Sequence, residues 1–146
     1  MDPKRRFDMA GGFVPDAGAA GWQTSTASIL ALAPLAASLA IFDEVGMPAL
    51  RERSVALTGY LSGLLDDLPV EVITPRDPAL RGCQLSLRLA AVESVLAMLA
   101  ARGVVADFRA PDIIRVAPVP LYNTYHDAWR LAELLRESMA VQQQGA

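Results

Sequence analysis

The sequence is poor in the residue types that most often carry chemistry. Among its 146 residues, Lys4 is the only lysine, Cys83 the only cysteine and His126 the only histidine. One cysteine cannot form a disulfide within the chain, which fits a reducing cytoplasm. A structural zinc site is not expected without a cluster of histidines and cysteines. All other positive charges are arginines, so a lysine nucleophile or Schiff base cannot come from the body of the chain.

Charge is also missing from one long stretch. No charged residue occurs from Ala17 to Phe42, and the run TASILALAPLAASLAIF has the apolar character of a membrane span. Polar side chains dilute this run, however, and Pro34 interrupts it. We therefore favour a buried helix from about Ser28 to Val45, packed on nearly all sides. Such a helix needs neighbours, so part of its surface is expected to face another subunit or a missing domain.

The overall composition predicts one globular domain. Hydrophobic residues make up 53% of the chain, which is enough for a packed core. The net charge of -3 argues against non-specific nucleic-acid binding, which needs a basic face. Residues 1–20 are rich in glycine and proline and predict an irregular N-terminal arm.

A second helix is predicted from about Pro48 to Asp66, because leucines recur there at helical spacing. Its predicted buried face consists of Leu50, Leu57, Leu61, Leu64 and Leu68. The predicted remaining surface holds Arg51, Arg53, Ser54, Thr58 and Ser62.

Strands are predicted where apolar residues alternate with polar ones or run without interruption. The segment CQLSLRL (83–89) is the clearest, and it places Cys83 on the buried face as a core thiol rather than a nucleophile. VEVIT (70–74), VVADFR (104–109) and IIRVA (113–117) predict three more strands. AVESVLAMLAARG (91–103) predicts a compact helix between them, which Gly103 ends.

The last helix is predicted to begin near Thr124 and to run to about Ala140, because Thr124 and Asp127 have the spacing of a capping box. His126 is expected at the surface. The residues expected in the core from this helix are Trp129, Leu131, Leu135 and Met139. The whole order of elements predicts an α+β fold, in which helices cover a small and largely antiparallel sheet.

Arg115 is a permanent charge within the apolar strand IIRVA, and Pro118 and Pro120 stiffen the backbone after it. In one interpretation the arginine lies on the solvent face of an edge strand or pairs with an internal carboxylate. In the other, its planar guanidinium binds the carboxylate of a ligand through two parallel hydrogen bonds. Tyr122 and Asn123 are then candidates to line the same pocket, although turn chemistry explains Asn123 equally well.

Three segments together resemble the C-terminal part of kynureninases: FDEVGMPALRERSVALTGYLSGLL, RGCQLSLRL and RGVVADFRAPDIIRVAPVPLYNTYHDAWRLAELL. Kynureninases are pyridoxal-phosphate enzymes of the fold type I aminotransferase superfamily, and the resemblance extends from about Phe7 to about Leu135. It implies that residues 21–146 form the C-terminal small domain of such an enzyme. The large domain with the Schiff-base lysine is then expected to be lost or encoded elsewhere, since Lys4 lies in the predicted arm.

The resemblance also implies a reaction and its participants. Kynureninases hydrolyse kynurenine or 3-hydroxykynurenine to anthranilate or 3-hydroxyanthranilate and alanine, in tryptophan catabolism and NAD biosynthesis. The implied cofactor is pyridoxal 5'-phosphate. The implied assembly is a cytoplasmic homodimer, or a complex with a complementary N-terminal domain that binds the cofactor. The resemblance implies no catalytic residue in this chain, which is expected to be inactive alone.

Four residues are candidates for the site. Arg115 matches the family arginine that holds the substrate α-carboxylate, and Tyr122 and Asn123 follow it. GWQTSTASIL resembles the family segment GWQxSNPPIL, whose asparagine reaches the cofactor phosphate from the neighbouring subunit. Thr26 stands at that position, and its hydroxyl group has one hydrogen bond to donate.

Two other classes of function compete with an enzyme domain. A non-catalytic binding or assembly module, or a decayed gene, would keep the fold and pair with itself or a full-length homologue through the apolar first helix. A membrane-attached protein is the third possibility, and it rests only on residues 17–42.

Overall fold

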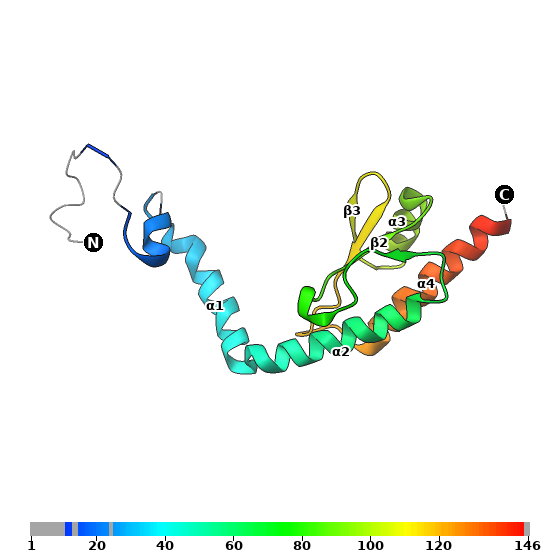
Figure 1. Cartoon of the computed structure of the whole chain (residues 1–146), viewed down its shortest axis with the longest axis horizontal. Helices are drawn as coiled ribbons and strands as arrows, with labels where there is room; N and C mark the ends of the chain where they lie inside the picture. The colour runs from blue at the N-terminus through cyan, green and yellow to red at the C-terminus, as the bar shows by residue number, and fades with distance from the viewer. Residues whose placement is uncertain (1–10, 13–14, 24, 145–146) are drawn as a thin grey trace. The chain divides into compact units, whose positions relative to one another are not determined.

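The computed structural model describes residues 11–12, 15–23 and 25–144. Most of the predicted N-terminal arm, with Lys4, lies outside them. The chain divides into two units, Met1–Glu44 and Val45–Ala146, which we describe separately (Figure 1). The first unit contains a short 3-10 helix, η2 (Gly18–Trp22), followed by all but the last residue of the long helix α1 (Ile29–Val45).

Helix α1 confirms the predicted helix but not its predicted burial. None of its residues is buried, and Ile29 and Leu30 are more than four-fifths exposed. The described residues of its own unit therefore do not pack this helix on nearly all sides, and the expected neighbouring subunit or missing domain stays a prediction. Among the described residues, no single helix has both the length and the apolar character needed to cross a membrane. Helix α1 and the following helix, Met47–Leu65, reach that length and apolar character only as a pair.

The second unit contains the predicted sequence of helices and strands. Its elements are α2 (Met47–Leu65), β1 (Glu71–Val72), η3 (Pro78–Leu80), β2 (Leu85–Arg88), α3 (Val92–Ala101), β3 (Asp107–Arg109), β4 (Ile113–Val116) and α4 (Tyr125–Gln144). The strands are shorter than the apolar runs that predicted them. Gly103 follows α3 in the left-handed region, with a φ of 77°, as expected for a residue that ends a helix.

The four strands form one antiparallel sheet in the order β1-β2-β4-β3, which confirms the predicted fold class. In the central pair, Leu85 lies opposite Val116 and Leu87 lies opposite Ile114. All four side chains are buried. Because side chains alternate across a sheet, the residues between them, including Arg115, belong to the other face.

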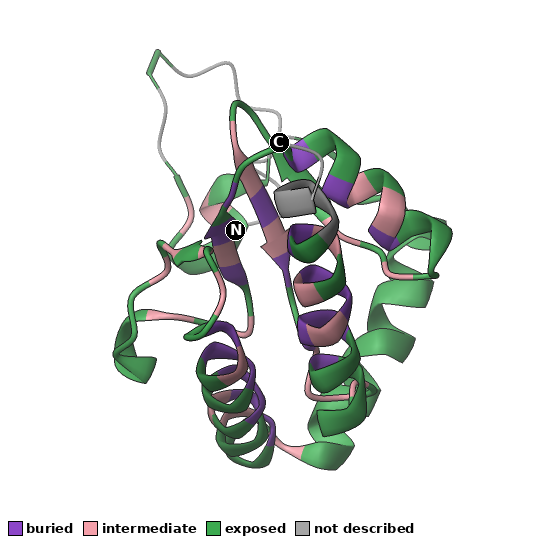
Figure 2. Ribbon diagram, turned by 90° about the vertical axis from the view of Figure 1, so that its right-hand side faces the viewer, coloured by how far each residue is buried: buried purple, intermediate pink, exposed green. Residues whose placement is uncertain are grey.

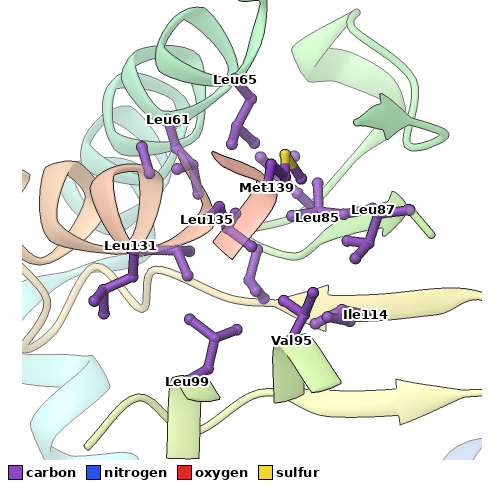
Figure 3. Close-up of a cluster of buried hydrophobic side chains, with 14 of the residues drawn as sticks. Leu61, Leu65, Leu85, Leu87, Val95, Leu99, Ile114, Leu131, Leu135 and Met139 are labelled. Carbon is purple, nitrogen blue, oxygen red and sulfur yellow. The ribbon is translucent and has the colours of Figure 1, made fainter. Parts of the chain in front are cut away.

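The hydrophobic core lies between this buried face of the sheet and helices α2, α3 and α4. The buried stripes of α2 and α4 are visible in Figure 2, and the side chains meet in Figure 3. The largest fully buried members of the cluster are Leu61, Leu65, Leu85, Leu87, Val95, Leu99, Ile114 and Leu135. The second unit therefore has a core of its own.

Helix α2 corrects the predicted division of its surface. Ser54, Thr58 and Ser62, predicted to lie largely away from the core, are buried. Leu65 is buried, whereas Leu64 is only partly so. The hydroxyl group of Thr58 donates to the carbonyl oxygen of Ser54 at 2.8 Å, so its burial leaves no unmet hydrogen bond.

Two further expectations for single side chains are wrong. Trp129 is 43% exposed and stacks on His126, with ring centroids 5.3 Å apart, whereas Leu131, Leu135 and Met139 are buried as predicted. Cys83 precedes β2 and is only half-buried. The surface position of His126 is confirmed.

Candidate functional site

The second unit contains an open cleft of ≈ 600 Å³ beside the end of β4 and the start of α4. Arg115, Tyr122 and Asn123, three of the four predicted site residues, line this cleft. Thr26, the fourth, lies in the first unit, where it is exposed just before α1. The other residues of the cleft that are discussed below, or that lie beside them, are Leu61, Asp107, Pro118, Val119, Asp127 and Arg130.

Arg115 reaches the cleft from the sheet face opposite the core. Its strand, β4, lies between β2 and β3, so the arginine is not on an edge strand. Its side chain is 32% exposed, and one terminal nitrogen donates to Asp107 Oδ2 in an ion pair. Within the described part of the chain, the Nε atom of Arg115 is buried without a hydrogen-bond partner. The arginine therefore both pairs with an internal carboxylate and lines a cleft.

Asp107 faces Arg115 across the β3–β4 pair, and a second arginine contacts the same carboxylate oxygen. Arg109 Nη2 lies 3.0 Å from Asp107 Oδ2. The hydrogen bond from Arg115 is the main reason that the pKa of Asp107 lies below its ordinary value. The carboxylate is therefore ionised at neutral pH, and the three side chains together carry one net positive charge.

The chain after β4 forms a hydrogen-bonded turn that places Tyr122 and Asn123. The backbone N–H of Val119 donates to Asn123 Oδ1 at 2.8 Å, and the N–H of Asn123 donates to the carbonyl oxygen of Val119 at 2.9 Å. Arg53 of α2 donates to the carbonyl oxygen of Asn123 at 3.1 Å. Asn123 thus forms the turn through its side-chain oxygen, which supports the turn interpretation, while Tyr122 stands 72% exposed at the cleft.

The capping box predicted at the start of α4 is present. Thr124 N–H donates to Asp127 Oδ2 at 2.7 Å, and Asp127 N–H donates to Thr124 Oγ1 at 3.2 Å. The hydrogen bond from the Thr124 backbone, followed by that from its hydroxyl group, lowers the pKa of Asp127. Because Asp127 also lines the cleft, the cap fixes one wall of the candidate site.

The residue that sequence reasoning did not identify is Asp107. An internal carboxylate was one of the two partners considered for Arg115, but no particular residue was assigned. The available signal was the short connection between the strands, since residues 109 and 113 are opposite each other and Asp107 then faces Arg115. In a tight antiparallel hairpin, the residues that face each other can be found by counting outward from the turn.

Comparison with known families gives a match over most of the second unit. Residues 50–135 match the family described as Kynureninase C-terminal domain. The chain is 52% identical over 143 residues to a kynureninase of Salinispora tropica, covering 93% of this chain and 33% of that protein. It is 53% identical over 136 residues to a kynureninase of Koribacter versatilis, covering 90% and 32%. The chain thus spans about a third of the length of these curated relatives.

A more distant fungal relative and a solved structure agree with this match. Kynureninase 1 of Aspergillus oryzae is 49% identical over 144 residues, which are 91% of this chain and 30% of that protein. The structure of a NifS-like protein superposes with a TM-score of 0.68 at 17% identity, covering 88% of this chain and 38% of that chain. At that identity the superposition supports the α+β fold alone.

Proposed function

Because this chain belongs to the kynureninase C-terminal domain family, we propose that it is the substrate-binding portion of a kynureninase. That enzyme would hydrolyse kynurenine or 3-hydroxykynurenine to anthranilate or its 3-hydroxy form and alanine, in tryptophan catabolism. The observation that carries the proposal is the position of Arg115, whose guanidinium lines an open cleft on a stiff segment of chain. A cytoplasmic location belongs to the same proposal.

The physical role of Arg115 follows from its geometry. A guanidinium binds a carboxylate with more directionality than an ammonium group, because its N–H donors lie in one plane. Arg115 is held by strand pairing on both sides of β4, and buried Pro118 follows it. We expect it to orient an amino-acid substrate by the α-carboxylate, with the exposed ring of Tyr122 beside the same cleft.

The family implies pyridoxal 5'-phosphate, and the described residues do not fit its covalent attachment. The cofactor would supply an electron sink for cleavage of a carbon–carbon bond. Its attachment requires a lysine, and the only lysine of the sequence, Lys4, lies outside the described residues. Thr26 would offer one hydroxyl hydrogen bond to the phosphate. We therefore derive no chemical step from this chain and propose that a complementary N-terminal domain or a second subunit completes the site.

The proposal predicts that the chain alone has no kynureninase activity. Purified chain is mixed with pyridoxal phosphate and L-kynurenine, and anthranilate is followed by its fluorescence. We expect no turnover above the rate without protein. Activity is expected when the N-terminal two-thirds of the Salinispora tropica kynureninase is added, and it should disappear with Arg115→Gln. Turnover by the chain alone would contradict the proposal that another domain or subunit completes the site.

Binding tests the role of Arg115 without any catalysis. L-kynurenine and kynuramine, which lacks only the α-carboxylate, are titrated into ¹⁵N-labelled chain, and dissociation constants are obtained from NMR shifts. We expect L-kynurenine to bind more tightly than kynuramine, and Arg115→Gln to abolish that preference. An equal affinity of the two ligands for the unaltered chain would contradict the proposed carboxylate site.

A non-catalytic assembly module is the second candidate, because α1 has an apolar surface that the described residues of its own unit leave exposed. Size-exclusion chromatography of the chain, with and without the N-terminal two-thirds of the Salinispora tropica kynureninase, distinguishes the enzyme domain from the assembly module. The enzyme proposal expects a complex with that fragment, whereas an assembly module expects self-association that the fragment does not change. The DNA immediately upstream provides an independent check, since a lysine-bearing cofactor domain encoded there favours the enzyme.

A further inference from the structure

The β3–β4 pair places one acidic residue directly against the arginine of the candidate site. Asp107 lies opposite Arg115 in the antiparallel register, so both side chains stand on the same face of the sheet. The carboxylate accepts a hydrogen bond from a terminal nitrogen of Arg115, and Arg109 contacts the same oxygen at 3.0 Å. Asp107 and Arg115 both line the cleft.

The guanidinium of Arg115 is held at one end by a charged partner. A terminal nitrogen is paired with Asp107, whereas the Nε atom is buried and, among the described residues, has no hydrogen-bond partner. An unrestrained arginine loses considerable rotational freedom when it binds a ligand, and a side chain already held in place loses less. The negative charge of Asp107 is shared with Arg109, so the group keeps a net positive charge that attracts an anion.

We propose that Asp107 is a positioning residue, which holds the guanidinium of Arg115 in the orientation that receives the substrate α-carboxylate. This inference rests on the proposed function, because it assumes that Arg115 binds that carboxylate. The opposite possibility is that Asp107 competes with the ligand for Arg115. The two differ in sign: loss of the acidic charge weakens ligand binding if Asp107 positions the arginine, and strengthens it if Asp107 competes.

The decisive variant is Asp107→Asn, which removes the charge and nearly preserves the shape. Dissociation constants for L-kynurenine and kynuramine are measured by NMR titration at an ionic strength near 0.15 M, where long-range attraction is screened. We expect a three- to tenfold loss of affinity for L-kynurenine and little change for kynuramine. Asp107→Glu, which restores the charge on a longer side chain, should recover part of the loss.

A matched control exists at the other edge of the same sheet. Glu71 of β1 lies opposite Arg88 of β2, and their side chains form an ion pair of 2.6 Å that does not line this cleft. Glu71→Gln therefore removes an equivalent cross-strand charge without touching Arg115. We expect both affinities to remain within twofold of those of the unaltered chain. An equal loss in this variant would mean that the effect of Asp107→Asn reflects general weakening of the sheet.

The outcomes separate this inference from the proposed function. If Arg115→Gln leaves the preference for L-kynurenine intact, the carboxylate site itself is wrong. If Arg115→Gln abolishes that preference while Asp107→Asn retains or increases it, the site stands and the positioning role fails. The ¹H–¹⁵N signal of Arg115 Nε gives a second reading, since it should shift in Asp107→Asn even without ligand. An unchanged signal would also count against positioning.

Discussion

Helices α1 and α4 have similar lengths, 17 and 20 residues, and opposite relations to the core. Helix α1 has no charged residue before Asp43, yet none of its residues is buried. Helix α4 carries several charges and still buries a continuous stripe. The members of that stripe are Ala128, Leu131, Ala132, Leu134, Leu135 and Met139. The spacing of apolar residues, rather than their number, thus decides whether a helix is buried within its own unit.

The largest expected effect tests this difference directly. Leu135→Ala empties a fully buried position and should lower the free energy of unfolding by about 2–5 kcal/mol. Leu39→Ala is the matched change in α1, where the side chain is 52% exposed, and it should cost less than about 0.5 kcal/mol. Urea unfolding followed by circular dichroism measures both. Similar costs would show that α1 is packed in solution.

The capping box gives a smaller effect at the start of the buried helix. Thr124→Ala removes the hydroxyl group that accepts from Asp127 N–H, and typical losses for such a change are about 1 kcal/mol. Asp127→Ala removes the reciprocal acceptor. Because both residues belong to one box, the double variant should lose less than the sum of the single losses. Strict additivity, measured by the same urea titrations, would contradict a reciprocal cap.

The smallest expected effect is the pH dependence of that cap. Hydrogen bonds from Thr124 hold the pKa of Asp127 below its ordinary 3.8, so the ionised form is favoured in the folded chain. Its contribution is fully present above the unfolded pKa and is lost as the pH falls through the folded value. The difference in stability between the unaltered chain and Asp127→Asn should therefore be constant from pH 7 to 5 and shrink below 4. A difference that persists at pH 2 would assign the effect to packing.

The sequence alone predicted the type and order of the elements well, because each left a local signal. Leu85, Leu87 and Leu89 alternate with polar residues and are all buried. The box of Thr124 and Asp127 fixed the start of the last helix to within one residue. These patterns depend on neighbours within a few positions along the chain, which are visible without the fold.

The errors concern polar and aromatic residues near the edges of the buried helix faces. Ser54 and Thr58 are four residues apart on the buried side of α2. The hydroxyl group of Thr58 donates a hydrogen bond to the backbone carbonyl oxygen of Ser54. Trp129 lies one position beyond Ala128, which belongs to the buried stripe, so the large ring falls outside it. Helical spacing of the apolar residues assigned both incorrectly, because it does not record local hydrogen bonds or the exact edge of the buried stripe.

The candidate site shows the same limit. Arg115 was identified from its own strand, and the turn at Asn123 from its residue type. The pairing of Arg115 with Asp107 could be predicted only from the register of two strands. Thr26 belongs to the first unit and the cleft to the second, so the role of Thr26 could not be read from the cleft. Their roles toward substrate and cofactor stay predictions until the binding experiments are done.

The alternation along β4 places core residues and a residue of the candidate site within one strand of four residues. Ile114 and Val116 point into the core, and Arg115 between them points to the cleft. Inserting or deleting one residue within the strand would exchange the two faces, driving a guanidinium into hydrocarbon and an isoleucine into the cleft. Changes in loop length near this hairpin are therefore tolerated only outside the strand, and redesign of this region must proceed by substitution.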